Sequence, residues 1–206
     1  MRASGETVSA AIASRRSVRR FAPRPVNPGV IRDLVLLACT APAPHHSRPW
    51  RFASVESGAA RERLTDAMAD AWRVDLQQAG RSVHDIQKLV LRSRAQIMDA
   101  PALLLACLSL EDARRWPDQR RRSAERDMFV QSLGAALQNI LLAAGERGLA
   151  GYLKGAPLFC RDAVRQALDL PPAWQPAFLV LLGHPEARPA LPSRPGVALD
   201  DFLAER

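Results

Sequence analysis

The 206-residue sequence has few aromatic residues, few cysteines and no long apolar segment. Aromatic side chains make up 5% of the chain, with a single tyrosine, which argues against a protein that stacks the bases of single-stranded nucleic acid. The three cysteines, Cys39, Cys107 and Cys160, are spread along the chain beside apolar residues. This odd and sparse set favours reduced, buried thiols in a cytoplasmic protein over a disulfide framework.

Membrane insertion and export are not expected from the sequence. No apolar run approaches the ~20 consecutive residues that a membrane-spanning helix needs. Met1–Glu6 has no basic head followed by an apolar stretch, so no secretory signal is expected. Hydrophobic residues still make up 48% of the chain, which is enough for a sizeable core. Without repeats or an interior linker, residues 1–206 are expected to form a single domain.

Positive charge dominates the composition. Lysine and arginine number 29 against 21 aspartates and glutamates, giving a formal charge of +8, and nearly all the basic residues are arginine. The planar guanidinium fork of arginine binds phosphates and carboxylates, so an anionic ligand is expected. Two alternatives remain open: a nucleic-acid-binding module, and GC-rich coding, which enriches arginine and alanine whatever the function.

Hydrophobic spacing predicts helices with strands scattered among them, an α+β fold rather than a regular βαβ alternation. Asn27-Pro28 is a typical helix start, with a capping asparagine and a proline in the first turn. The expected helices are a short one from Val8, then Pro28–Ala38, Gly58–Ala79, Ser82–Asp99, Ser123–Gly148 and Arg161–Leu168. The expected strands are Arg51–Val55, Leu103–Leu110 and Phe178–Leu182, with a short segment at Gly151–Leu153, and with loops at Ala41–Pro49 and Glu111–Arg122.

The longest predicted helix, Ser123–Gly148, is apolar almost all the way round. A helix of this kind is buried on every side. In so short a chain this predicts burial between two subunits, and hence a homodimer. The proline-rich tail, 187–206, ends with apolar residues that need a surface to rest on, and we expect it to pack on the partner subunit.

A basic cluster, Arg15-Arg16-Ser17-Val18-Arg19-Arg20-Phe21, lies where a helix gives way to an extended segment. Neighbouring guanidinium groups and a hydroxyl offer several donors for the oxygens of a phosphate. The alternative is a solvated helix end, where cations are favoured by the helix dipole.

Four motifs in order resemble those of the nitroreductase family. The cluster Arg15-Arg16-Ser17-x-Arg19-x-Phe21 resembles the family's opening motif. The other three are Ala41–Trp50, Gly134-x-x-x-Gln138-Asn139 followed by Gly148–Gly151, and Gly183-His184-Pro185. The resemblance covers about residues 7–195.

The resemblance implies a fold, a cofactor and a set of ligand contacts. It implies a nitroreductase-like α+β fold with a central mixed or antiparallel sheet, an intertwined homodimer, bound FMN and ping-pong turnover with NAD(P)H. The flavin carries the chemistry, so no catalytic side chain and no metal is expected. The residues implied at FMN are Arg15, Arg16, Ser17 and Arg19, together with His46 and Arg48, where the family often has Asn and Gln, the backbone of Gly151, and Arg188 or Arg194 at the phosphate. His45 and Lys154 are assigned to the substrate.

A more specific likeness concerns the acceptor. His45-His46, Ala124–Phe129 and Leu158–Cys160 resemble the C-terminal reductase domain of the bifunctional coenzyme F420 ligase. That likeness implies an anionic deazaflavin precursor as substrate, for which Arg120–Arg122 and Arg126 would form a cationic rim. The alternatives are a general NAD(P)H-dependent nitro or quinone reductase, and a flavin-binding protein without turnover.

Overall fold

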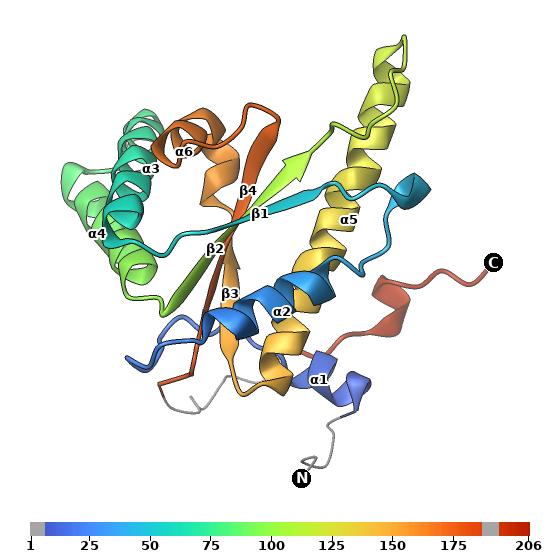
Figure 1. Ribbon diagram of the computed structural model, residues 1–206, viewed down its shortest axis with the longest axis horizontal. Helices are drawn as coiled ribbons and strands as arrows, with labels where there is room; N and C mark the ends of the chain where they lie inside the picture. Colours follow the sequence, from blue (N-terminus) through green and yellow to red (C-terminus); the bar gives the residue numbers. More distant parts are fainter. Residues whose placement is uncertain (1–6, 187–193) are drawn as a thin grey trace.

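A four-stranded antiparallel sheet lies between two layers of helices in the computed structural model, which describes residues 7–186 and 194–206 (Figure 1). The strands are β1 (Trp50–Ser54), β2 (Ala102–Ser109), β3 (Ala150–Lys154) and β4 (Trp174–Gly183), in the order β1-β2-β4-β3. The helices are α1 (Val8–Ser14), α2 (Pro28–Ala38), α3 (Gly58–Gln78), α4 (Val83–Met98), α5 (Gln119–Glu146) and α6 (Arg161–Ala167). Short 3-10 turns are η1 (Pro44–His46), η2 (Ala156–Phe159) and η3 (Leu199–Asp201). The predicted α+β class is confirmed, and all three strand pairings are antiparallel.

The alternation of side chains along β2 divides the core into two halves. Leu104, Ala106 and Leu108 face α2 and α5, whereas Leu103 and Leu105 face the opposite layer of α3, α4 and α6. Successive residues of a strand point to opposite faces, so this strand, apolar on both faces, is covered by helices on both sides. The sheet is thereby fixed between the layers, with β3 at one edge.

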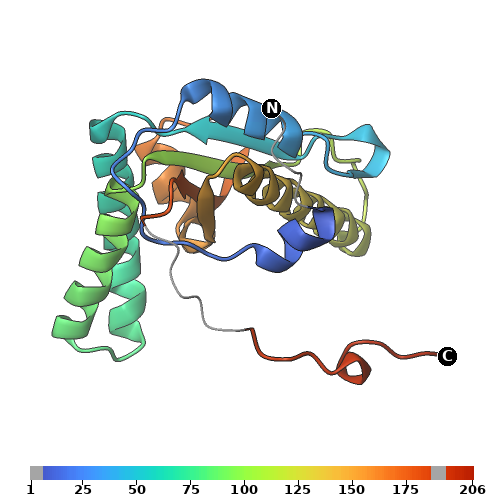
Figure 2. The same cartoon turned by 90° about the horizontal axis from the view of Figure 1, so that it is seen from below.

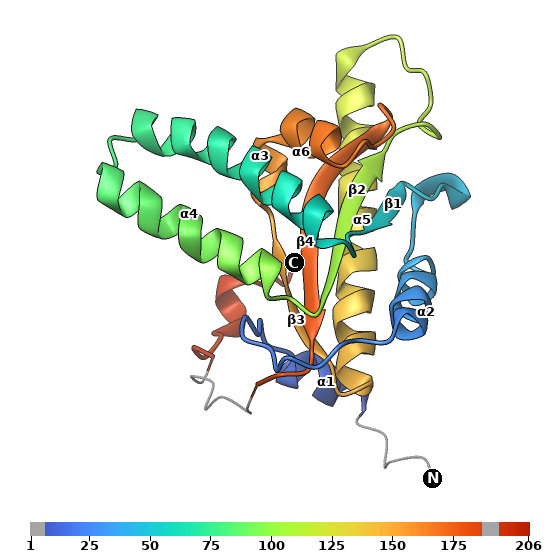
Figure 3. The same ribbon diagram turned by 60° about the vertical axis from the view of Figure 1, so that its left-hand side comes forward.

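The helices α3 and α4 form an antiparallel pair that projects from the sheet (Figure 3). Arg61 of α3 ties the base of this pair to the sheet. Its Nε donates to the Val55 carbonyl at 3.0 Å, and its Nη1 donates to the Met98 carbonyl at 3.2 Å and to the Ala100 carbonyl at 2.6 Å. The guanidinium therefore satisfies carbonyl groups at the end of α4 that have no partner within the helix. Burial lowers the pKa of Arg61 from its usual value.

The start of α5 differs from the sequence prediction. Residues Glu111–Arg122 were expected to be a loop, but the helix already begins at Gln119. The Asp118 side chain accepts from the backbone N–H of Arg121 at 2.9 Å and caps the helix there. The run of arginines masks this start, because it has no apolar periodicity. The expected loop therefore ends at the cap rather than at Arg122.

Within the single chain α5 is buried along one side, and its expected burial between two subunits stays a prediction. One stripe, which includes Phe129, Leu137 and Ile140, is fully buried, while Met128 and Val130 are 41% and 42% exposed. By length and composition α5 meets a criterion for a membrane-spanning helix, and 44% of that apolar window is buried inside the chain, so the helix alone is weak evidence for a membrane span. Met128 and Val130 are thus apolar side chains that the described part of this chain leaves partly uncovered.

Beyond Arg194, the C-terminal segment lies away from the body of the chain (Figure 2). Leu199 and Phe202 in this segment are 64% and 77% exposed. Val8 and Ile12 of α1 are also exposed, at 74% and 48%. These apolar side chains have no cover from the described part of the chain.

Candidate functional site

The basic cluster after α1, residues 15–20, runs along the sheet edge formed by β3; we call it the arginine segment. Ser17 forms a parallel bridge with Gly151, and the Val18 N–H donates to the Gly151 carbonyl at 3.2 Å. Further on, the Ala22 N–H donates to the His184 carbonyl at 2.8 Å. Three of the four sequence motifs therefore meet at one edge of the sheet: the opening cluster, the turn after α5 and the end of β4.

Gly151 is required here by the sheet itself. A Cβ at this position would lie 2.4 Å from the Leu181 carbonyl oxygen and 2.7 Å from Leu182 Cδ2. No side chain can be accommodated at that separation, so glycine allows β3 to pair with β4. The close approach that the structure records is to backbone of β4; the approach of a flavin to Gly151 stays a prediction.

Arg16 lies just after the end of α1, and one N–H of its side chain has no hydrogen-bond partner among the described residues. Its Nη1 donates to the Ala13 carbonyl at 2.9 Å and to the Arg15 carbonyl at 3.1 Å. Its Nε is buried and has no hydrogen-bond partner among the described residues. A buried N–H without an acceptor is costly. The guanidinium is thus held in place with an open donor, which suits an anionic acceptor supplied by a ligand.

Beside this segment a cluster of cations gathers around Gln96. Lys154 Nζ and the Tyr152 hydroxyl both donate to Gln96 Oε1 at 3.1 Å, and the Arg19 guanidinium lies 5.2 Å from the centre of the Tyr152 ring. Burial, followed by the charges of Arg19 and Arg92, lowers the pKa of Lys154 to about 8. Burial also raises the pKa of Tyr152 to about 12.

These cations lack carboxylate partners. No ion pair of the described residues includes Arg15, Arg16, Arg19, Arg92 or Lys154. A hollow of about 520 Å³ opens next to them, which we call the arginine hollow. Its lining residues are Arg19, Arg20, Phe21, Arg92, Ala95, Gln96, Asp99 and Glu186. The excess of positive charge at this edge favours an anion.

Gln96 and Arg92 were not predicted from the sequence. Lys154 was predicted as a substrate residue, but its contacts were not. Arg92 and Gln96 are four residues apart on α4 and therefore share one helix face. No family motif covers α4, and only its position against β3 brings these residues to the arginine segment. The single tyrosine, Tyr152, directly follows Gly151. Its place beside that motif was the one feature of the sequence that could have indicated polar side chains at this edge of the sheet.

The predicted cofactor residues His46 and Arg48, and the predicted substrate residue His45, lie elsewhere. His45, His46 and Arg48 are exposed in and after η1, along the N-terminal half of α5, whereas α1 lies by the C-terminal end of that helix (Figures 1 and 3). His45 Nδ1 lies 3.2 Å from Arg114 Nη2. Within one chain, the structure does not bring His46 and Arg48 to the arginine segment.

The turn that carries the two histidines is strained. His45 and His46 have φ angles of 54° and 56°, in the left-handed region that non-glycine residues rarely adopt. Such conformations cost of order 1–3 kcal/mol each and concentrate at functional sites. Among the described residues, no group of three or more potential ligands that includes them could hold a metal ion.

Of the two C-terminal arginines considered for the phosphate, one reaches the arginine segment. Arg194 Nη2 donates to the Arg15 carbonyl at 2.5 Å. Arg188 lies outside the described residues. The expected cationic rim is partly engaged in local contacts, since Arg121 pairs with Asp118 and Arg122 Nη1 donates to the Trp116 carbonyl at 2.9 Å.

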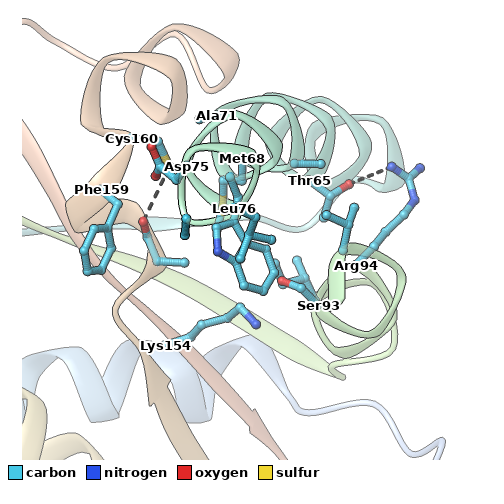
Figure 4. Close-up of a pocket in the computed structure, with 16 residues that line it drawn as sticks. Thr65, Met68, Ala71, Asp75, Leu76, Ser93, Arg94, Lys154, Phe159 and Cys160 are labelled. Atoms are coloured by element: carbon cyan, nitrogen blue, oxygen red, sulfur yellow. Dashed lines mark hydrogen bonds between the residues drawn. The ribbon is translucent and has the colours of Figure 1, made fainter. Parts of the chain in front are cut away.

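A second cavity, of about 430 Å³, lies between α3, α4 and η2 (Figure 4); we call it the α3–α4 cavity. Its wall is largely apolar and includes Met68, Trp72, Ile97 and Phe159. Lys154 is part of the lining, and its contact with Gln96 links this cavity to the arginine hollow.

The sequence of this chain is similar to those of known proteins. A Bacillus subtilis protein named as an NAD(P)H nitroreductase, YfhC, is 27% identical over 184 residues, which are 89% of this chain and 87% of that protein. The iodotyrosine deiodinase of Danio rerio is 25% identical over 92% of this chain, which spans 63% of that protein.

Solved structures share the fold at low identity. A BluB-like flavoprotein from Clostridium difficile has a TM-score of 0.78 at 20% identity, covering 98% of this chain and 100% of that one. The FMN-dependent nitroreductase NfnB from Mycobacterium smegmatis, solved in complex with NADPH, has a TM-score of 0.71 at 20% identity, covering 96% and 97%. The model of the Nitroreductase family matches residues 12–184. Because that match spans most of the sequence, including the arginine segment and all four strands, the chain belongs to the nitroreductase family.

Proposed function

We propose that this chain holds FMN by its phosphate at the arginine segment and reduces a small acceptor with electrons from NAD(P)H. Family membership supports the predicted class, an FMN-dependent oxidoreductase. The single observation that carries the phosphate assignment is the cluster of Arg15, Arg16 and Arg19, which lacks carboxylate partners and includes a buried Nε without an acceptor.

The residues at this edge fit an FMN phosphate. Guanidinium groups form short, charge-assisted hydrogen bonds to phosphate oxygens. Arg16 is held by two backbone carbonyls, and Ser17 is fixed by its bridge to β3, so both are positioned before a ligand arrives. When bound, FMN supplies the electron transfer, while Gln96, Tyr152 and Lys154 provide polar groups beside it. Arg194 brings the C-terminal segment to the same place.

A second copy of the chain would complete the site. His46 and Arg48 are the predicted cofactor residues that lie away from the arginine segment, so in a homodimer they would serve the partner's FMN. The exposed Met128 and Val130 of α5 and the exposed apolar residues of α1 and the tail are side chains that such a partner would cover. A solved relative is an FMN-dependent nitroreductase in complex with NADPH, which supports NAD(P)H as the donor.

For the acceptor there are two candidates. The general one is a nitro or quinone compound, which agrees with the relatives named as nitroreductases. The specific one is a dehydro precursor of coenzyme F420, supported by the sequence likeness of His45-His46 and Leu158–Cys160. Turnover of that precursor with no turnover of simple nitroaromatics would select the second, and the reverse would select the first.

The test of the function is optical. We expect the purified protein to show the visible absorbance of oxidised flavin, and NADPH or NADH to bleach it under anaerobic conditions. Bleaching by neither donor would leave a flavin-binding protein without turnover. A colourless protein that takes up no added FMN would contradict the proposal.

A further inference from the structure

The α3–α4 cavity has the size and lining of a small-molecule site. Its volume of about 430 Å³ falls in the range of about 300–1,000 Å³ that is usual for ligand pockets. Trp72 and Phe159 contribute aromatic surface, and Met68 and Ile97 contribute aliphatic surface. Phe159 is 81% exposed, so this aromatic side chain has no cover of its own. Trp72 already packs against Ala69, Ile86 and Val90, and an aromatic ligand would add a stacked or edge-to-face contact for Phe159.

The polar side chains that line the cavity differ in whether their charge is free to bind a ligand. Arg94 is paired with Asp66 and also donates to Thr65 Oγ1 at 3.1 Å. Cys160 donates to the Ala156 carbonyl, and burial with the charge of Asp75 raises the pKa of its thiol, which therefore stays protonated. Neither of these groups offers an open charge to a ligand.

Lys154 is different from these groups. Its ammonium has three donors, and one acceptor, Gln96 Oε1, is recorded for it. It has no carboxylate partner among the described residues, and Arg19 and Arg92 add to the positive charge around it. The remaining carboxylate of the lining, Asp75, belongs to an exposed residue of α3, beside Cys160 in Figure 4. A half-buried cation at one end of an apolar cavity is suited to an anion with an apolar body.

We propose that the α3–α4 cavity binds the aromatic body of a small organic anion, whose acidic group accepts a hydrogen bond from Lys154. The inference does not depend on the proposed function, because it concerns binding alone. The site itself is formed by α3, α4, β3 and η2 of one chain, and it adjoins the arginine hollow through the contact between Lys154 and Gln96.

Calorimetric titration of the purified, flavin-loaded protein tests this with two probes of the same shape, 2-naphthoate and the uncharged 2-naphthylmethanol. We expect 2-naphthoate to bind more tightly. Lys154→Met should weaken 2-naphthoate about tenfold or more, as expected for a charge-assisted hydrogen bond, and leave 2-naphthylmethanol unchanged. Lys88→Met removes the other lysine, which is exposed on α4, and should change neither affinity.

Ser93→Phe, which fills the cavity from α4, should abolish binding of both probes. The proposal is overturned if the wild-type protein binds no 2-naphthoate, if Lys154→Met binds it as tightly as the wild type, or if Ser93→Phe keeps its affinity. Flavin content is measured for every protein. Loss of flavin in the wild type would count against the proposed function, whereas a flavin-loaded protein that ignores 2-naphthoate would count against the cavity alone.

Discussion

Arg16 illustrates how one side chain combines structure with a candidate binding role. Two of its hydrogen bonds are to the Ala13 and Arg15 carbonyls at the end of α1, and these alone would explain an arginine at a helix C-terminus. They leave Nε buried and without an acceptor among the described residues. The interpretation as a solvated helix end does not account for that atom, whereas a bound phosphate does.

Replacing Arg16 should therefore weaken FMN binding. Arg16→Ala removes a charge-assisted contact that is worth about 1.5–3 kcal/mol, so we expect the dissociation constant of FMN to rise at least about tenfold. Arg24→Ala is the matched control, since Arg24 is exposed and lies beyond the arginine segment. The ratio of flavin to protein absorbance after dialysis is the measurement. Equal flavin retention by both variants would refute the role given to Arg16.

The pKa of Lys154 predicts a pH dependence of anion binding. Its charged form binds the anion and is lost as the pH rises through about 8, so the affinity for 2-naphthoate should be constant below that pH and fall above it toward the affinity of Lys154→Met. Tyr152, with a pKa of about 12, stays neutral to well above this range. Calorimetric titrations between pH 6 and about 10 test this. A flat profile, or one shared by 2-naphthylmethanol, would contradict it.

At the scale of the elements, β3 brings the site together. This short strand pairs with β4 on one side and receives the arginine segment on the other. It also carries Tyr152 and Lys154 toward α4. Its position depends on close backbone packing at Gly151.

Gly151→Ala should therefore destabilise the fold. The added methyl group would overlap the Leu181 carbonyl oxygen, and overpacking of this kind costs about 1–3 kcal/mol. Gly145→Ala is the control, because a Cβ there has no neighbour within 4 Å, and alanine favours a helix by about 0.5–1 kcal/mol. Urea unfolding monitored by circular dichroism measures both. Equal midpoints for the two variants would show that β3 tolerates a side chain at this position.

Most elements could be predicted because their signals are local. Asn27 caps α2 as expected, accepting from the Gly29 N–H at 2.7 Å, and the apolar run of β2 is buried between the two helical layers. The start of α5 was missed because Asp118 caps a turn made of arginines, which have no hydrophobic period. The contacts of Lys154 could not be predicted, because they depend on where α4 lies against β3.

At the scale of the whole molecule, the predicted cofactor residues form two groups. Arg15–Arg19 lie at the β3 edge, and His46 and Arg48 lie along the N-terminal half of α5 (Figure 1). The sequence motifs predicted both groups of residues, but they did not indicate that the two groups lie apart within one chain. The proposed dimer joins them across two chains and also accounts for the exposed apolar residues of α1 and the tail.

Mixing two inactive variants tests whether the site is shared. If each FMN contacts Arg16 of one chain and His46 of the other, a heterodimer of Arg16→Ala and His46→Ala chains has one intact site. Random exchange of subunits should then restore flavin binding to about a quarter of all sites. If both groups served the same FMN within one chain, or if the protein were monomeric, mixing would restore nothing. Light scattering of the wild-type protein gives the mass independently.

The central claim is that the anionic end of FMN binds at the arginine segment. The most direct measurement is a crystal structure of the purified protein with FMN bound. We predict the phosphate oxygens within hydrogen-bonding distance of Arg16 Nε and the Ser17 hydroxyl, next to Gly151. A flavin whose phosphate lies elsewhere, with the Arg16 Nε still lacking an acceptor, would contradict the account.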